Sequence, residues 1–370
     1  MQLSDEDIVM IDDSLQHICR DLAEDVFARP EQTCEPSRFL AVLDLFVDQG
    51  FVNTTDDDGC GLWEGCEQAP QLALTLRNLT TIAKVSASLA LSLHRSALAL
   101  HLLRQLGESN IGEAHPCISL HGRHGIGRGE LANWWCGQPV DEPLLQDVFD
   151  PDRVCSGVMH GQVRVLLAPV FTAGAMAWQL IRGEVRGSTS GHGLDELHDG
   201  AFESGQARTV QVPAHRAKAL ARDIWHREWL GLLAIQQGCV QQMMEMAQQF
   251  SALRFQGGRV IAGHPAVQIM LADMQAALTD VRIVLAGQAL NESGFVDLLR
   301  ARNRLHEGLA LAANVAMQTF GGLGYMLDNG IEKRWRDVNH LRQQSGGALD
   351  MQLMSANWAF TRTTATGAHA

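Results

Sequence analysis

The sequence has little positive charge and no long uninterrupted hydrophobic run. Its 29 lysine and arginine residues face 42 aspartate and glutamate residues, giving a formal net charge of −13 at pH 7. This balance argues against a nucleic-acid partner or an anionic membrane surface, because either would need a basic docking stripe. Arg77, Lys84 and Arg95 interrupt the most apolar segment, residues 71–107. We therefore expect a buried helix or helix pair there and no membrane span.

Export signals and metal-binding patterns are also lacking. The first seven residues, MQLSDED, are acidic and do not form a charged-then-apolar signal. The eight cysteines are scattered, so a cytoplasmic location with reduced thiols is expected. Cys60 and Cys66 are the only close pair, and their spacing matches no common zinc pattern. His115, His121 and His124 are near neighbours without an accompanying carboxylate pattern, so we expect no metal.

The composition and the pattern of residues along the chain predict a soluble globular protein with three zones. Hydrophobic residues make up 46% of the chain and charged residues 19%, as is typical of globular proteins. A length of 370 residues suffices for two or three domains. We expect a mostly α fold with a central β domain. The predicted parts are an N-terminal helical domain over 1–107, a middle β domain over 108–213 and a C-terminal four-helix bundle over 214–370.

Helical patterns support the first and third zones. Ser4 and Asp7 have the spacing of a capping box, and apolar residues with a helical period follow them. In the third zone, residues 215–250 contain no proline and predict a long helix. Pro265 stands where the first turn of the next helix tolerates it. A further helix is expected over 303–319.

The middle zone has frequent glycine and short alternating runs. The runs at 163–167, 177–180 and 209–212 predict short strands. Residues 121–129, HGRHGIGRG, could suit phosphate, but they match no Gly-x-Gly-x-x-Gly pattern after a strand. A flexible loop is therefore preferred there over a nucleotide cradle.

The most specific patterns are two blocks in the third zone. Residues 254–274 read RFQGGRVIAGHPAVQIMLADM, and residues 318–347 contain QTFGGLGY, an Arg-Asp pair and SGG, in that order. The blocks resemble the acyl-CoA dehydrogenase family of flavoproteins. That family shows Arg-x-x-Phe-Gly-x-x-Ile before a helix, then a Gln-x-x-Gly-Gly-x-Gly-[Tyr/Phe] turn, an Arg-Asp pair and a Glu-Gly-Thr loop. The chain is identified as a divergent member, because Ser345 stands where the loop glutamate would be.

The resemblance implies an FAD-dependent oxidoreductase of fatty-acid or acyl-CoA catabolism. Such an enzyme forms an α,β-unsaturated acyl-CoA thioester and passes electrons to an electron-transfer flavoprotein. It is expected to be a homotetramer, a dimer of dimers, in which neighbouring subunits share the flavin contacts. Arginine suits the FAD diphosphate because its fork of donors matches phosphate oxygens, and glycines let backbone N–H groups approach phosphates. The implied cofactor-binding residues are Arg254, Gln318, Gly321, Gly322, Ser345 and Gly347.

Two further features follow from the comparison with the family. The strands that usually hold the flavin ring are not recognisable here, and Trp178 or the pair Trp134–Trp135 could supply an aromatic wall instead. The charged residues after the glycine turn are expected to form structural ion pairs that fix the turn. They are Glu332, Lys333, Arg336 and Asp337.

In the commonest members of the family the loop glutamate is the catalytic base. Glu228 is a candidate replacement for it in this chain. Removal of an α-proton needs a carboxylate whose pKa burial has raised toward neutrality. A minority branch of the family places its glutamate 26 residues before the diphosphate arginine, and counting back from Arg254 gives Glu228. Gly238 matches the small residue ten positions later. Trp229 stands where arginine is common, so it is expected either to reshape the acyl pocket or to belong to the core.

Two other functions remain open at this stage. The chain could be a non-catalytic subunit of a hetero-oligomeric dehydrogenase with a homologous partner, which would keep the bundle while the middle domain diverges. It could also be a flavin-dependent monooxygenase on the same fold, a branch that likewise lacks the loop glutamate. Glu228 counts against the second alternative, because oxygenation needs no carboxylate base at that place.

Overall fold

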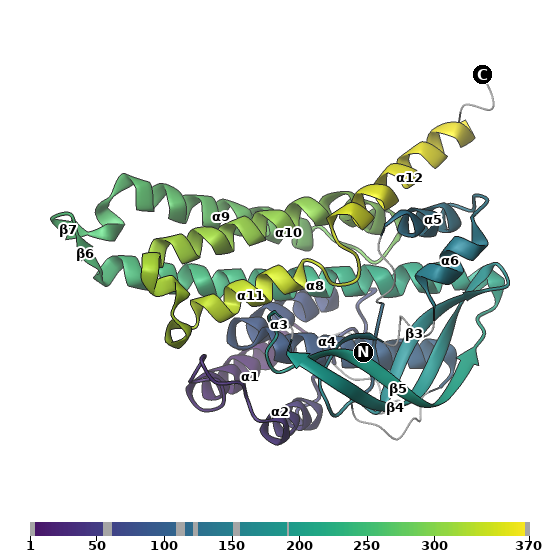
Figure 1. The fold of residues 1–370 in the computed structure, drawn as a ribbon, viewed down its shortest axis with the longest axis horizontal. Coiled ribbons are helices and arrows are strands. Elements are labelled where there is room, and N and C mark those ends of the chain that lie inside the picture. Colours follow the sequence, from purple (N-terminus) through teal and green to yellow (C-terminus); the bar gives the residue numbers. More distant parts are fainter. Residues whose placement is uncertain are drawn as a thin grey trace.

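The computed structural model describes residues 4–54, 61–108, 115–120, 125–150, 156–190 and 192–366. Figure 1 shows long C-terminal helices lying across a group of N-terminal helices, with a sheet beside both groups. The fold is mostly helical, with its small sheet in the middle of the chain, as the sequence predicted. Within the described ranges, no helix combines enough length and hydropathy to cross a membrane.

Four N-terminal helices form the lower layer in Figure 1. Their bounds are α1 Asp5–Glu24, α2 Pro36–Asp48, α3 Ala69–Val85 and α4 Ala87–Leu106. The predicted capping box is present, because Asp7 N donates to Ser4 Oγ at 3.1 Å and Ser4 N donates to Asp7 Oδ2 at 2.9 Å. Ser86 separates α3 from α4 and caps the second helix. The apolar segment is thus a helix pair, and nearly all of α4 is buried.

The sheet has five strands in the order β1-β3-β4-β5-β2. The strands are β1 Cys117–Ile118, β2 Ser156–Met159, β3 Val165–Thr172, β4 Ala175–Ser190 and β5 His198–Val210. β1 runs parallel to β3, and the other neighbours are antiparallel. Trp178 on β4 lies opposite Pro169 on β3 and Val210 on β5, which fixes the register at the centre of the sheet.

Five further helices make up most of the rest of the described chain. They are α8 Ala214–Leu253, α9 Pro265–Ala286, α10 Glu292–Phe320, α11 Ile331–Leu341 and α12 Ala348–Thr366. A short hairpin of β6 Phe255–Gln256 and β7 Arg259–Val260 joins α8 to α9. Pro265 occupies the first turn of α9, as its position predicted. The QTFGGLGY block ends α10 and continues as a 3₁₀ helix, Gly321–Tyr325.

Several expected boundaries were wrong. α10 begins at Glu292, well before the predicted 303, because the Asn291 side chain caps the helix by accepting from Gly294 N at 2.9 Å. The described part of the middle zone also contains the helices α5 Ile126–Trp135 and α6 Glu142–Val148, which its frequent glycines gave no reason to expect. Gly129, expected in a flexible loop, lies inside α5, whereas residues 121–124 lie outside the described part of the chain.

Candidate functional site

Glu228 lies in the middle of α8 and is completely buried. Its carboxylate accepts hydrogen bonds from three side chains on other elements. Arg95 on α4 donates to Oε1 from Nη2 at 2.9 Å and from Nε at 3.3 Å. Ser345, in the loop between α11 and α12, donates from Oγ to Oε1 at 2.7 Å. His94 Nε2 contacts the other oxygen, Oε2, at 2.8 Å.

The contacts of His94 fix the position of its proton. Trp63 Nε1 lies 2.9 Å from His94 Nδ1. An indole N–H can only donate, so Nδ1 must accept. The imidazole proton therefore lies on Nε2 and is donated to Glu228. Trp63 has a positive φ of 69°, an uncommon backbone conformation for a bulky residue. The orientation of His94 thus depends on a constrained tryptophan outside α4.

The loop that follows α11 is held against Glu228 from two directions. Arg302 on α10 donates from Nη1 to the Gly346 carbonyl and from Nη2 to the Gln344 carbonyl, both at 2.7 Å. Asp350 at the start of α12 accepts from Gly347 N at 3.0 Å. Ser345 itself has a φ of 54°, so this non-glycine residue adopts a left-handed conformation next to the carboxylate. The two positions at which the resemblance implies a glutamate, 228 and 345, are therefore in contact.

The electrostatic state of Glu228 differs from the expectation. Burial alone would raise the pKa of its carboxyl. The Arg95 guanidinium, together with the hydrogen bonds from His94 and Ser345, outweighs burial and holds the pKa of Glu228 below its ordinary value. The carboxylate is therefore ionised, and the predicted rise of its pKa toward neutrality was wrong for this arrangement. The sequence could not reveal Arg95, which lies 133 residues away along the chain.

Tryptophan side chains from three elements surround the same part of α8. Trp135 from α5 makes edge contacts with Trp225 and Trp229, with ring centroids 5.9 Å and 6.4 Å apart. Trp178 from β4 lies 6.0 Å from Trp225. Trp229 Nε1 also donates to the Ser345 carbonyl at 3.2 Å. Trp229 is therefore both a core residue and a support of the loop. Trp135 and Trp178, two of the candidates for an aromatic wall, both belong to this cluster.

Two glycines allow the neighbouring helices to approach α8. A Cβ added at Gly231 would lie 2.3 Å from the His94 ring, so only glycine admits His94 in its present place. A Cβ at Gly238 would lie 2.3 Å from the Thr80 carbonyl on α3. Gly238, singled out by its spacing from Glu228, thus serves the close packing of α3 on α8.

A second group of predicted site residues gathers at the far end of α8. Arg254 caps this helix, and Gln318, Gly321 and Gly322 stand at the end of α10. Stacking of Phe250 on Phe320, with centroids 4.3 Å apart, joins the two helix ends. The four residues are exposed, and a Cβ at Gly321 or Gly322 would meet nothing within 4 Å. In the described part of the chain, no hydrogen bond or ion pair engages the Arg254 guanidinium.

The two groups of residues are far apart within one chain. At 1.5 Å per residue, the 26 helical steps from Glu228 to Arg254 correspond to roughly 39 Å along α8. Ser345, predicted alongside Arg254, is instead buried in contact with Glu228, and Gly347 is buried in the same loop. The six predicted cofactor residues therefore form two half-sites rather than one.

The charged residues of α11 form ion pairs, but not with the glycine turn. Arg336 Nη2 donates to Asp195 Oδ2 at 3.0 Å, and Lys333 Nζ donates to Glu196 Oε1 at 2.9 Å. Asp337 accepts from Leu194 N at 2.6 Å. Glu332 pairs with Arg336 within the helix. These contacts tie α11 to the segment between β4 and β5, so the expected ion pairs exist with different partners.

The described residues include some of the cysteines and histidines considered as metal ligands. Among the described residues, no group of three or more histidine, cysteine, aspartate or glutamate side chains is arranged to hold a metal ion. Cys60, His121 and His124 lie outside the described residues. Cys66 is a buried free thiol. Its pKa is raised to about 11 because it is withdrawn from water.

Comparison with known proteins finds similarity over the C-terminal part of the chain. Residues 220–357 match the family model described as acyl-CoA dehydrogenase, C-terminal domain. The 3-sulfinopropanoyl-CoA desulfinase of Advenella mimigardefordensis is 28% identical over 165 residues, or 44% of this chain and 41% of that protein. The acyl-[acyl-carrier-protein] dehydrogenase MbtN of Mycobacterium bovis is 28% identical over 194 residues, or 41% of this chain and 49% of that protein. The chain thus matches less than half the length of these curated relatives.

The fold likeness extends further than the sequence likeness. The structure of butyryl-CoA dehydrogenase from Megasphaera elsdenii aligns with a TM-score of 0.69 over 97% of this chain and 99% of that one, at 15% identity. Residues 220–357 thus resemble the C-terminal domain of acyl-CoA dehydrogenases, and the chain as a whole has the fold of butyryl-CoA dehydrogenase.

Proposed function

We propose that this chain is a flavin-dependent oxidoreductase that dehydrogenates an acyl thioester between its α and β carbons, with Glu228 as the base. The observation that carries the proposal is the hydrogen bond of 2.7 Å from Ser345 to Glu228. The family's two glutamate positions are in contact here, so a carboxylate on α8 can take the place of one on the loop. The family and its fold support the reaction class.

The residues of both half-sites suit FAD. The free, exposed guanidinium of Arg254 and the open backbone at Gly321 and Gly322 match a diphosphate in charge and in donor type. Among the described residues near Glu228, the buried indole N–H groups of Trp135 and Trp225 have no hydrogen-bond acceptor. A flavin ring carries nitrogen and oxygen atoms that accept such bonds. When bound, FAD would supply the acceptor for the hydride of the substrate.

The two oxygens of Glu228 have different tasks in this proposal. Oε1 takes the donors of Arg95 and Ser345, which orient the carboxylate and keep it ionised. Oε2 has a single donor, His94, and is the oxygen with room to receive a proton. Because the resting pKa is low, the His94 contact must loosen when the acyl group enters. The surrounding tryptophans exclude water, which strengthens every charge interaction around the carboxylate.

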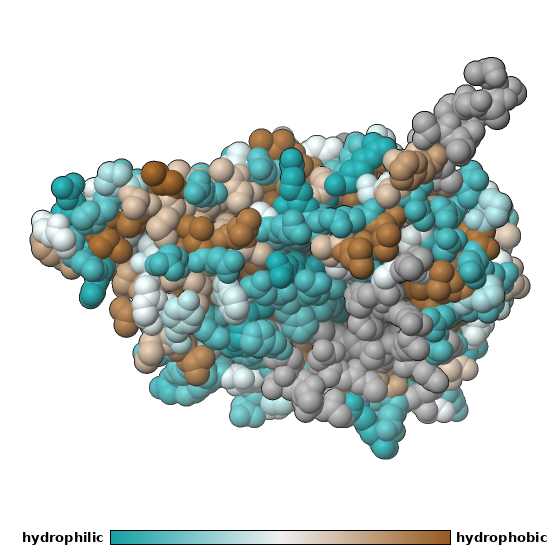
Figure 2. All heavy atoms as spheres, turned by 45° about the horizontal axis from the view of Figure 1, so that its top comes forward, coloured by the Kyte–Doolittle hydropathy of each residue, from teal (hydrophilic) through white to brown (hydrophobic). Residues whose placement is uncertain are grey.

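We also propose that two chains complete each flavin site. Arg254 and Glu228 are too distant to meet one another across a single cofactor in one chain, as the length of α8 shows. The outer face of α9 and α10 carries exposed apolar residues, and Figure 2 shows apolar patches along this side of the molecule. The exposed apolar residues of these two helices include Ile269, Ile283 and Leu311, and each is more than half exposed. Large apolar patches of this kind favour association with another subunit. A homotetramer that reduces an electron-transfer flavoprotein remains our proposal.

The second candidate function is that of a non-catalytic subunit beside a homologous catalytic one. The observation in its favour is that Glu228 is wholly buried and that its carboxylate is hydrogen-bonded to Arg95, His94 and Ser345. A chain that retains only the cross-subunit contacts would need Arg254 and Gln318 but not an accessible base.

One experiment separates the two candidates. The chain is purified alone, its visible spectrum is recorded, and acyl-CoA thioesters of graded chain length are added without oxygen. A catalytic chain is yellow, and its oxidised-flavin absorbance at about 450 nm falls as the thioester is oxidised. A colourless chain that acquires flavin only with a co-expressed homologue would contradict the leading proposal and support the second.

A further inference from the structure

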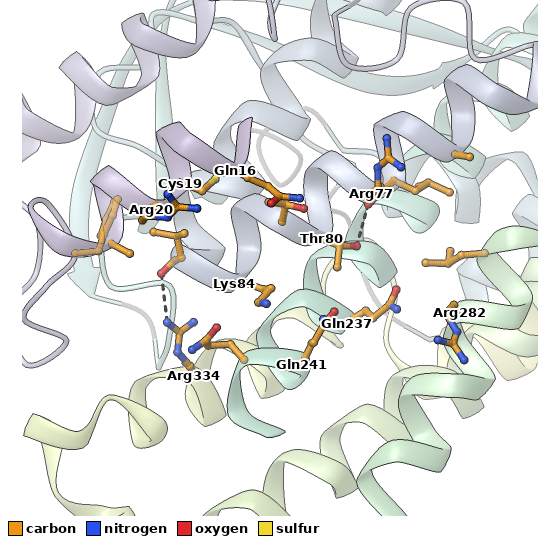
Figure 3. Close-up of a pocket in the computed structure, with 18 of the residues that line it drawn as sticks. Gln16, Cys19, Arg20, Arg77, Thr80, Lys84, Gln237, Gln241, Arg282 and Arg334 are labelled. Atoms are coloured by element: carbon orange, nitrogen blue, oxygen red, sulfur yellow. Dashed lines mark hydrogen bonds between the residues drawn. The ribbon is translucent and has the colours of Figure 1, made fainter. Parts of the chain in front are cut away.

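A cavity of about 810 Å³ lies between the N-terminal and C-terminal helices, away from Glu228. Side chains from α1, α3, α8, α9 and α11 line it (Figure 3). Its residues on α8 include Gln237 and Gln241, both on the C-terminal side of Glu228. Gln241 is 13 helical steps from Glu228 and 13 from Arg254, or roughly 20 Å from each. The cavity is therefore separate from both half-sites.

The cavity is cationic although the protein is acidic. Five basic side chains line it, and no aspartate or glutamate is among its described lining residues: Arg20, Arg77, Lys84, Arg282 and Arg334. Figure 3 shows Arg20 and Arg334 near one end and Arg77 and Arg282 near the other. The whole chain has a formal charge of −13, so the positive charge of the cavity does not follow from the overall composition.

Two of the five cations have carboxylate partners at the cavity margin. Arg77 Nε lies 3.2 Å from Asp12 Oδ1, and Lys84 Nζ lies 2.7 Å from Glu245 Oε1. These pairs hold the two side chains in place and cancel their charges. They leave the other three cations as the excess charge of the cavity.

The remaining three cations lack such partners. Within the described ranges, neither Arg20 nor Arg282 makes a side-chain hydrogen bond or an ion pair. Arg334 donates to the carbonyl of Val85 at 3.5 Å, which is a weak contact. Burial lowers the pKa of the Arg334 guanidinium. An anion placed against it would restore electrostatic stabilisation, because a partly buried charge interacts strongly with a counter-charge.

The rest of the lining is suited to an organic ligand. The amides of Gln237 and Gln241 lie between the two cationic ends (Figure 3). Apolar side chains complete the wall, among them Phe27, Leu76 and Leu285. A volume near 810 Å³ falls in the range of small-molecule sites and exceeds what a single inorganic ion needs.

We propose that this cavity is a binding site for an organic phosphate of nucleotide size. Its phosphates would lie against Arg20 and Arg334, and Arg282 would bind a second anionic group at the opposite end. Guanidinium groups bind phosphate oxygens through paired hydrogen bonds, and the apolar wall would cover the organic part. The site is independent of the flavin chemistry proposed above.

The test uses the full chain as purified and measures binding of ADP and of inorganic pyrophosphate by calorimetry. We expect saturable binding of ADP that is tighter than binding of pyrophosphate and that weakens as salt is raised. The double variant Arg20→Gln/Arg282→Gln should bind ADP at least about tenfold more weakly, the cost of losing one charged hydrogen bond or more. Both side chains are exposed, so the fold should be retained, and unchanged circular dichroism and flavin content would verify this.

The matched control is Arg254→Gln, which removes an exposed arginine from the diphosphate half-site. ADP is also a part of FAD and of coenzyme A, so this control separates the cavity from those sites. Weakening of ADP binding by the double variant supports the proposal, whatever the control shows. Absence of saturable binding overturns it, as does binding that Arg254→Gln weakens and the double variant leaves unchanged. Equal affinity for ADP and pyrophosphate would overturn the assignment to an organic ligand.

Discussion

Ser345 Oγ donates a hydrogen bond of 2.7 Å to Oε1 of Glu228, across 117 residues of sequence. The contact joins the loop after α11 to the middle of α8. It explains how a chain without a glutamate at position 345 can keep a carboxylate at the same place. The serine hydroxyl and the Arg95 guanidinium share one carboxylate oxygen, so the other oxygen is the reactive one in the proposed chemistry.

Gly231→Ala should disrupt the support of Glu228. The new methyl group would lie 2.3 Å from the His94 ring, which Trp63 and Glu228 hold in place. We expect a loss of about 1–3 kcal/mol in the free energy of unfolding, the usual cost of overpacking a core, measured by urea denaturation. Gly308→Ala in α10 is the matched control, because its methyl group would meet nothing within 4 Å. Equal stability of the two variants would contradict the role given to His94.

Arg302→Lys should loosen the loop that carries Ser345. The arginine fork donates to the carbonyls of Gln344 and Gly346, and a lysine cannot reach both with the same geometry. We expect a loss of about 2 kcal/mol in stability and faster amide exchange over residues 343–347. Arg304→Lys, at an exposed position of the same helix, should change neither quantity. Unchanged exchange in the Arg302 variant would show that the loop is held by other contacts.

Acid should destabilise the protein through buried neutral histidines. Burial lowers the pKa of His160 from 6.5 to about 3 and that of His226 to about 4. Between pH 6.5 and these values the unfolded chain binds a proton that the folded chain does not bind. The free energy of unfolding therefore falls as the pH falls, by up to about 1.4 kcal/mol per pH unit for each histidine. Above pH 6.5 neither group contributes to a pH dependence.

The variant His160→Phe should reduce this pH dependence by the contribution of one histidine, up to about 1.4 kcal/mol per pH unit, and leave that of His226. His160 already packs beside the Phe39 ring, and its Nδ1 has no hydrogen-bond partner among the described residues, so an apolar ring is an acceptable replacement. The measurement is urea denaturation at a series of pH values between about 4.5 and 7.5, because histidine in an unfolded chain titrates within this range. His17→Gln, at an exposed position, is the control and should leave the slope as it is. A slope in His160→Phe equal to that of the wild type would contradict the contribution assigned to His160.

Mixed oligomers should show whether the two half-sites come from different chains. Glu228→Gln and Arg254→Gln variants are expected to be inactive when each is assembled alone. In a two-fold mixed dimer, one site would carry both substitutions and the other neither. Random co-assembly should therefore restore about a quarter of the wild-type turnover per chain. Complete inactivity of the mixture, with mixing verified by mass spectrometry, would show that each site is built within one chain.

The sequence predicted the helical parts of this fold well, because their signals are local. Capping at Ser4, the proline at the start of α9 and the helical period of the apolar residues each depend on neighbours within one or two turns. The beginning of α10 was missed because Ser293 and Gly294 have low helix propensity, although Asn291 is a recognisable cap. The helix α6 was missed although Asp141 caps it by accepting from Leu144 N.

The candidate site was identified from the sequence only where the family resemblance supplies an interval along the chain. The resemblance implies a glutamate 26 residues before Arg254, and that count gives Glu228, which lies on α8. Its partners Arg95, His94 and Trp63 come from other elements and reach it only by tertiary packing. Without them the pKa of Glu228 was expected to rise, whereas their combined effect lowers it.

The central claim is that Glu228 is the base of a dehydrogenation, and the rate of flavin reduction by an acyl-CoA thioester tests it most directly. The variant Glu228→Gln removes the charge and leaves Arg95 buried without its counter-ion, so it should also lose about 3–5 kcal/mol of stability. The measurement is made per bound flavin, at a temperature where the variant is folded, with Glu228→Asp as the matched carboxylate control. The account predicts a rate about 10²–10⁴ times slower for Glu228→Gln and a smaller loss for Glu228→Asp. A wild-type rate of flavin reduction in Glu228→Gln would contradict it.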